Sequence, residues 1–206
     1  MNVLVITAHA DDLELSMGGS VKKWTSNGGR VDNIIMTTHR DREDAIDDTT
    51  RILGHQAIFY PSHLLETARP TLSHKLVGDV EKFINTSTFT KQLCEYDYVI
   101  THWKEDWHQD HRVCYDLVRS MQRTNNQPMQ VMYMESYPYC NKYSNFDANV
   151  FVDTTETQSF KEDSIFAFGD LFPSLWVKGA EAHDAYRGSF IKAKYAECFK
   201  LDTMIL

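Results

Sequence analysis

Several features that would assign this chain to a large class of proteins are missing from its sequence. It has no surplus of basic residues, because 21 Lys and Arg stand against 29 Asp and Glu, for a formal net charge of -8. Broad nucleic-acid binding needs a basic surface, so none is expected. No apolar run approaches the roughly 18 residues of a membrane span, and the first residues enter a predicted strand without a secretion signal. We therefore predict a cytoplasmic protein with no membrane partner.

Cysteine is scarce, and no linker divides the chain. The four cysteines include no Cys-x-x-Cys pair that would indicate a structural zinc or redox motif, so they are predicted to be reduced and structural: Cys94, Cys114, Cys140 and Cys198. At 42% hydrophobic residues, 206 residues suffice for one core. No repeat or low-complexity tract is visible. We predict a single domain over residues 1–206.

Apolar, β-branched runs alternate with helical patterns along the chain. This order is typical of a parallel sheet covered by helices on both faces. The predicted fold is a single-domain α/β protein, a Rossmann-like three-layer sandwich with a mostly parallel central sheet. The predicted strands are 2–8, 30–38, 57–60, 96–101, 130–135 and 149–153, and the predicted helices are 15–26, 42–53, 72–86, 110–122, 155–170 and 181–199.

Two clusters of acid and imidazole follow two of these strands. The clusters are His9, Asp11, Asp12 and Glu14 after the strand at 2–8, and His108, Asp110 and His111 after the strand at 96–101. Open α/β sheets bind their ligands at the carboxyl ends of the strands. The clusters meet if the first and fourth strands are parallel neighbours, which the alternation of strands and helices favours.

The residue types in these clusters are those of a catalytic zinc site. Such a site takes about three protein ligands and leaves one position to water, and His9, Asp12 and His111 can supply that set. Asp11 and His108 remain as a base and an imidazole for metal-assisted hydrolysis. The histidines favour zinc over a magnesium-dependent phosphate site built on the Asp pair. An Asp pair after a strand is also a common helix N-cap, but the second cluster argues against that interpretation alone.

Three short motifs occur in order along nearly the whole chain. They are Ala8-His9-Ala10-Asp11-Asp12-Leu13-Glu14 followed by Gly18-Gly19, then His108-Gln109-Asp110-His111, and finally Arg187-Gly188 with Tyr195-Ala196-Glu197-Cys198-Phe199. Together they resemble the motifs of the LmbE-like or PIG-L N-acetylglucosaminyl deacetylases. Each motif alone is weak, but three at plausible separations make a specific signal.

The resemblance implies a zinc-dependent hydrolase that removes the acetyl group from an amino sugar, as an N-acetylglucosaminyl-type glycoside or nucleotide-linked sugar, releasing acetate and a primary amine. It implies one Zn²⁺ per chain, held by His9, Asp12 and His111, and no organic cofactor. Asp11 matches the general base that takes a proton from water at the metal. His108 matches the residue that stabilises the oxyanion and helps to protonate the leaving amine, with Asp110 orienting its ring.

The resemblance also suggests three substrate-binding residues, Arg42, Tyr195 and Glu14. The chain departs from the family pattern at Lys192, where a glycine is common. Hydrolysis of another amide or ester, or a non-catalytic sugar- or nucleotide-binding module, remain as alternatives. The sugar, its aglycone and the oligomeric state stay open, a homo-oligomer included.

Overall fold

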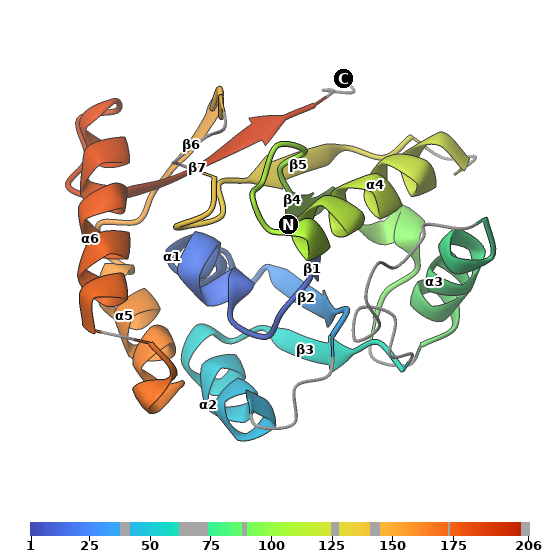
Figure 1. Cartoon of the computed structure of the whole chain (residues 1–206), viewed down its shortest axis with the longest axis horizontal. Helices are drawn as coiled ribbons and strands as arrows, with labels where there is room; N and C mark the ends of the chain where they lie inside the picture. The colour runs from blue at the N-terminus through green and yellow to red at the C-terminus, as the bar shows by residue number, and fades with distance from the viewer. Residues whose placement is uncertain are drawn as a thin grey trace.

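A seven-stranded sheet runs through the middle of the protein in the order β3-β2-β1-β4-β5-β7-β6 (Figure 1). The computed structural model describes residues 1–37, 42–61, 74–87, 90–124, 128–140, 145–172 and 174–202. The strands are β1 Asn2–Thr7, β2 Arg30–Ile35, β3 Gln56–Phe59, β4 Tyr98–His102, β5 Val131–Met134, β6 Val150–Asp153 and β7 Ala196–Leu201. Neighbours in the run β3-β2-β1-β4-β5 are parallel, whereas β7 is antiparallel to both β5 and β6.

Helices cover both faces of the sheet. On one side lie α1 Asp12–Ser26, α2 Glu43–Leu53, α5 Gln158–Phe166 and α6 Ser174–Ser189, and on the other lie α3 His74–Thr86 and α4 Gln109–Thr124 (Figure 1). Two short 3-10 helices, η2 Leu93–Glu95 and η3 Gly169–Leu171, complete the described elements. The predicted three-layer α/β fold with a mostly parallel sheet is confirmed.

Alternation along β1 builds two separate cores. Val3 and Val5 pack with α1, while Leu4 and Ile6 pack beneath α3 and α4 on the opposite face, and all four side chains are fully buried. Successive side chains of a strand point to opposite faces, so a strand covered on both sides is apolar throughout.

The strand order reverses between β1 and β4. Both of these strands run in the same direction and pair through Val3 to Tyr98, Leu4 to Val99 and Val5 to Ile100. Their carboxyl ends therefore open a crevice of the kind in which doubly wound sheets bind ligands. The prediction that the first and fourth strands are parallel neighbours is confirmed.

The predicted helix at 181–199 is wrong beyond Ser189. Helix α6 ends at Ser189, and residues 196–201 form β7 instead, because this segment fills the gap between β5 and β6 and bonds to both. The chain turns between them through Lys192, whose φ is 61°. The predicted helix at 155–170 shortens to α5, and α1 begins at Asp12 rather than at residue 15. Residue 38 of the second predicted strand and residues 72 and 73 of the third predicted helix lie outside the described residues.

Two further expectations can be compared with the structure. All four cysteines are free, as reduced cysteines should be, and Cys94 is exposed whereas the other three are buried. Within the described ranges, no helix combines the length and the apolar character needed to cross a bilayer.

Candidate active site

The parallel pairing of β1 with β4 brings the two predicted clusters together. His9 follows the end of β1, and Asp12 begins α1. His108 precedes α4, and His111 lies in the first turn of that helix. The rings of His9 and His108 are 4.6 Å apart, and those of His9 and His111 are 5.4 Å apart. Residues about one hundred positions apart in the sequence thus share one site.

A pocket of about 280 Å³ opens at this point. One part of its lining is polar and consists of His9, Asp11, Asp12, Arg42 and His108. The other part is apolar and aromatic and consists of Leu15, Tyr139, Leu171, Phe172 and Trp176. The rings of Phe172 and Trp176 are stacked at 5.6 Å, and Trp176 also meets the edge of Tyr139.

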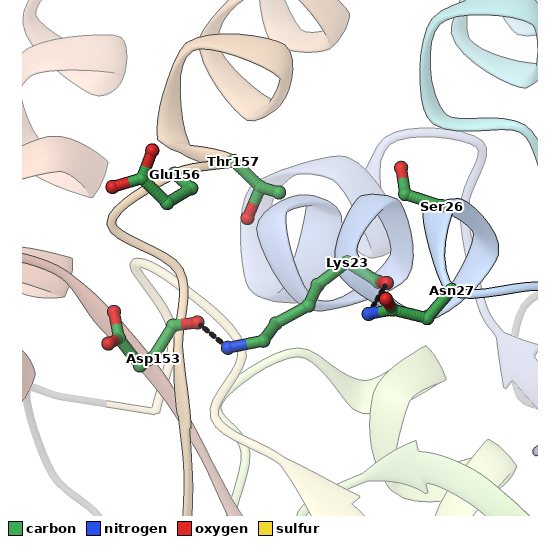
Figure 2. A pocket seen from close by; sticks show the side chains of 6 residues that line it. All are labelled: Lys23, Ser26, Asn27, Asp153, Glu156 and Thr157. Atoms are coloured by element: carbon green, nitrogen blue, oxygen red, sulfur yellow. Dashed lines mark hydrogen bonds between the residues drawn. The ribbon is translucent and has the colours of Figure 1, made fainter.

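A second pocket of similar size, about 250 Å³, lies beside the carboxyl end of α1. Figure 2 shows the Lys23 ammonium crossing it toward Asp153, whose carbonyl accepts its hydrogen bond at 2.6 Å. None of the described residues that line this pocket is a histidine. The two pockets therefore differ in chemistry and not in volume, because among their described lining residues imidazoles and carboxylates occur together in the first pocket only.

Asp12 lies at the centre of the predicted metal ligands. Its Oδ1 is 3.1 Å from Nε2 of His111, and its Oδ2 is 3.5 Å from Nδ1 of His9. Among the described residues, three overlapping groups could hold a metal ion, and within each group the potential ligand atoms lie within 4.8 Å of one another. Each pair of the predicted ligands occurs together in one of these groups. Burial favours the protonated acid, but the imidazoles of His111, His102 and His9 outweigh it and hold the pKa of Asp12 well below its usual range.

The donor set fits a metal ion. Nδ1 of His111 lies 2.8 Å from Oδ2 of Asp106, and a carboxylate can only accept, so Nδ1 carries the proton and Nε2 is turned to Asp12. Burial opposes charge on both imidazoles, yet the carboxylates raise the pKa of His9 to about 10 and that of His111 to about 9. The site thus attracts positive charge, and a divalent cation would replace these protons.

His102 is also close to Asp12, with its Nε2 3.2 Å from Oδ2. However, Nε2 accepts the backbone N–H of Ala8 at 3.1 Å, and Nδ1 lies 2.9 Å from Oγ of Ser136. Burial, together with His111, lowers the pKa of His102 to about 4. The neutral His102 ring therefore positions the end of β1. Because its Nε2 lone pair already accepts a backbone N–H, His102 is a poorer metal ligand than His9.

Asp11 and Arg42, which both line the pocket, form an ion pair. Nη1 of Arg42 donates to Oδ2 of Asp11 at 2.6 Å. Burial and the neighbouring Asp12 carboxylate raise the pKa of Asp11, and Arg42 and His9 oppose that shift. Arg42 is held here because it forms the N-cap position of α2. A carboxylate with a raised pKa is suited to accept a proton from water.

Asp110 lies between the two imidazoles that line the pocket. Its Oδ2 is 3.2 Å from Nε2 of His9 and 3.9 Å from Nδ1 of His108. The backbone N–H of Asp110 also points to Nδ1 of His108 at 3.3 Å. Burial, His9 and His111 lower the pKa of His108. Asp110 is thus near the ring it was predicted to orient, but its carboxylate is closer to His9.

Glu14 and Tyr195 do not line this pocket. Glu14 belongs to α1 and its side chain is fully buried, and this burial raises the pKa of its carboxyl to about 8. Tyr195 donates its hydroxyl hydrogen bond to Oε1 of Glu181 in α6 at 2.8 Å. The contact of these two residues with substrate stays a prediction.

The third sequence motif holds the structure together away from the pocket. Helix α1 is broken at Met17, and Glu197 of β7 accepts the backbone N–H groups of Gly19 at 3.0 Å and Ser20 at 2.6 Å just beyond the break. The buried Lys161 ammonium is 2.9 Å from Oε1 of Glu197. A Cβ on Gly19 would lie 2.9 Å from Thr154, so glycine is required there.

Four residues around the site were missed by the sequence reasoning or left without a role: Asp106, His102, Tyr139 and Trp176. Asp106 lies only two positions before His108, and this proximity was the one signal available. Tyr139 and Trp176 come from a loop and from α6, whose positions depend on the packing of distant elements.

Comparisons with known proteins identify a family and a shared fold. The family model PIG-L, described as GlcNAc-PI de-N-acetylase, matches residues 4–122. The N,N'-diacetylchitobiose deacetylase of Pyrococcus horikoshii is 19% identical over 97% of this chain and 83% of that chain, with a TM-score of 0.76. A comparison with curated proteins found no match.

Two other solved structures illustrate the range of this fold. GalB, the 4-carboxy-2-hydroxymuconate hydratase of Pseudomonas putida, is 13% identical over 100% of this chain and 97% of that chain, with a TM-score of 0.81. The zinc-inhibited form of teicoplanin deacetylase Orf2 is 15% identical over 98% of this chain and 100% of that chain, with a TM-score of 0.71. At these identities the likeness is one of fold.

Proposed function

Because the chain belongs to the PIG-L family, we propose that it is a zinc-dependent hydrolase that removes the N-acetyl group from an amino sugar. The observation that carries this proposal is the convergence of His9, Asp11, Asp12 and His108 on one pocket, with His111 directly behind them. These residues follow β1 and β4, the two strands between which the strand order reverses. An α/β fold forms its ligand site at this point.

In this proposal His9, Asp12 and His111 hold one Zn²⁺ per chain. When bound, zinc polarises the acetamide carbonyl and makes water easier to deprotonate. The set of two imidazoles and one carboxylate is typical of a catalytic zinc site, and imidazole favours zinc over magnesium. The Asp106 contact supports this assignment, since it leaves Nε2 of His111 available as a donor to the metal.

The remaining residues perform the proton transfers. Asp11, at the pocket surface, takes a proton from the attacking water, and Arg42 keeps its carboxylate aimed at the pocket. The ring N–H of His108 stabilises the negative charge that develops on the carbonyl oxygen, and His108 helps to deliver to the leaving nitrogen the proton that Asp11 has taken from water. Cleavage of the carbon–nitrogen bond then yields acetate and a primary amine. The backbone N–H of Asp110 restrains the His108 ring.

The apolar wall of the pocket supports a sugar as substrate. Tyr139, Phe172 and Trp176 line the same pocket as the polar residues. A sugar ring has apolar C–H faces and polar edges, so it can pack on such a wall while its acetamide faces the carboxylates and imidazoles. Arg42 is the proposed contact for a polar group of the same substrate.

The proposal is tested by zinc content and acetate release, measured on a panel of N-acetylglucosaminyl compounds. We expect about one zinc per chain and acetate from the wild type. Asp11→Asn should keep its zinc and lose activity by about 10²-fold or more. Asp47→Asn, an exposed carboxylate of α2, is the matched control and should retain activity.

Two other results of these measurements would contradict the proposal. A protein that binds zinc but releases acetate from no compound would contradict the deacetylase assignment and favour hydrolysis of another amide or ester, or a binding module. The hydratase GalB shares this fold, so the fold alone does not decide the reaction. A protein without zinc would contradict the ligand set.

A further inference from the structure

Asp106 is a buried carboxylate that none of the three sequence motifs includes. Its side chain is fully buried in the loop between β4 and α4. Oδ2 lies 2.8 Å from Nδ1 of His111 and 3.5 Å from Sγ of Cys140. Oδ1 accepts the backbone N–H of His108 at 2.9 Å. One carboxylate thus contacts both histidines of the second motif.

The local structure explains why Asp106 is well positioned. The backbone carbonyl of Asp106 accepts a hydrogen bond from Nη1 of Arg112 at 2.7 Å, and its N–H donates to the carbonyl of Trp103 at 3.2 Å. Hydrogen bonds to the backbone of Asp106 and to both of its carboxylate oxygens therefore fix the position of the carboxylate. A carboxylate restrained in this way can impose an orientation on a neighbouring ring.

We propose that Asp106 is a positioning residue that keeps the proton of the His111 ring on Nδ1, so that Nε2 remains a metal donor. This inference rests on the proposed function, because it concerns the zinc ligand His111. A neutral imidazole carries one proton, and the partner of the protonated nitrogen decides which nitrogen is left with a lone pair. Carboxylates that bind the far nitrogen of a ligating histidine fix its orientation and raise its basicity.

The substitution Asp106→Asn isolates this effect, because it preserves the shape of the side chain. Its Oδ1 can still accept the N–H of His108. The amide nitrogen in place of Oδ2 is a donor, so it would pair with an unprotonated Nδ1 of His111. The ring proton would then move to Nε2, the nitrogen that faces Asp12.

The first measurement is the zinc affinity of metal-free protein, determined at pH 8 by competition with a chromophoric chelator. Asp106→Asn should bind zinc about 10 to 100 times more weakly than the wild type. The matched control is Asp116→Asn, which removes an exposed carboxylate from α4, the helix that carries His111, and should leave the affinity unchanged. Circular dichroism of each metal-free variant confirms that it is folded.

The outcomes separate this inference from the proposed function. A folded Asp106→Asn variant with wild-type zinc affinity would overturn the role of Asp106 and leave the proposed function intact. A wild-type protein that binds no zinc would overturn both.

The second measurement needs no variant, so it holds even if Asp106→Asn does not fold. Nitrogen-15 NMR of the zinc-loaded wild type should find the His111 proton on Nδ1 and the metal on Nε2. Coordination through Nδ1 would refute the inference, since Asp106 could not then hold a proton at that atom.

Discussion

Lys161 provides the sharpest test of how the third motif stabilises the fold. Its ammonium is 1% exposed and lies 2.6 Å from Oδ2 of Asp184 and 2.9 Å from Oε1 of Glu197. Glu197 in turn accepts the two backbone N–H groups after the break in α1. One buried cation therefore joins α5, α6, β7 and α1.

The substitution Lys161→Met retains much of the apolar stem and removes the charge. It leaves two carboxylates buried without their cation, and breaking a buried ion pair from one side costs about 3 to 5 kcal/mol of unfolding free energy. For a chain of this length such a loss lowers the melting temperature by about 6 to 20 °C. The assay is urea unfolding followed by circular dichroism, with the exposed Lys178→Met of α6 as the matched control.

The loss should also depend on pH. Burial already raises the pKa of Glu197, and Lys161 opposes that shift, so removing the lysine raises this pKa further. A carboxyl whose folded pKa lies above its unfolded value stabilises the folded state at low pH and loses that contribution as the pH rises through the folded pKa. Lys161→Met should therefore be less destabilised at pH 5 than at pH 8. A variant within about 1 kcal/mol of the wild type at pH 8 would refute this reasoning, because an unpaired buried carboxylate costs more than that.

Two further predictions concern stability. Burial lowers the pKa of His55 to about 4, below its unfolded value of 6.5, so stability should be full above pH 6.5 and fall by up to about 3 kcal/mol as the pH drops toward 4. His55→Leu should flatten this acid limb in thermal unfolding, and an unchanged limb would show that other groups cause it. Lys192 has a φ of 61°, so Lys192→Gly should stabilise the protein by about 0.5 to 1 kcal/mol. Lys194→Gly, with no positive φ to relieve, should instead lower the melting temperature, and a gain in both would contradict the strain argument.

Local patterns predicted the strands of the central sheet other than β7. The apolar runs around Val3 and Val99 are buried on both faces, and such runs have a strong sequence signature. Gly54 ends α2 with a φ of 79°, as a glycine after a helical pattern predicts. The third motif was harder, because the strand at Ala196–Leu201 exists only through its bonds to β5 and β6. Its own residues do not exclude a helix.

By itself, the sequence determined that two acid and imidazole clusters follow two strands, because this requires only local periodicity and residue type. Which histidine nitrogen faces Asp12, and that Asp106 holds the other, depend on ring orientations set by packing between β1, β4 and α4. The aromatic wall of the pocket likewise comes from Tyr139, Phe172 and Trp176, which adjoin the clusters only in the folded chain. Tertiary structure decided these points because contacts between distant segments leave no periodic trace in one sequence.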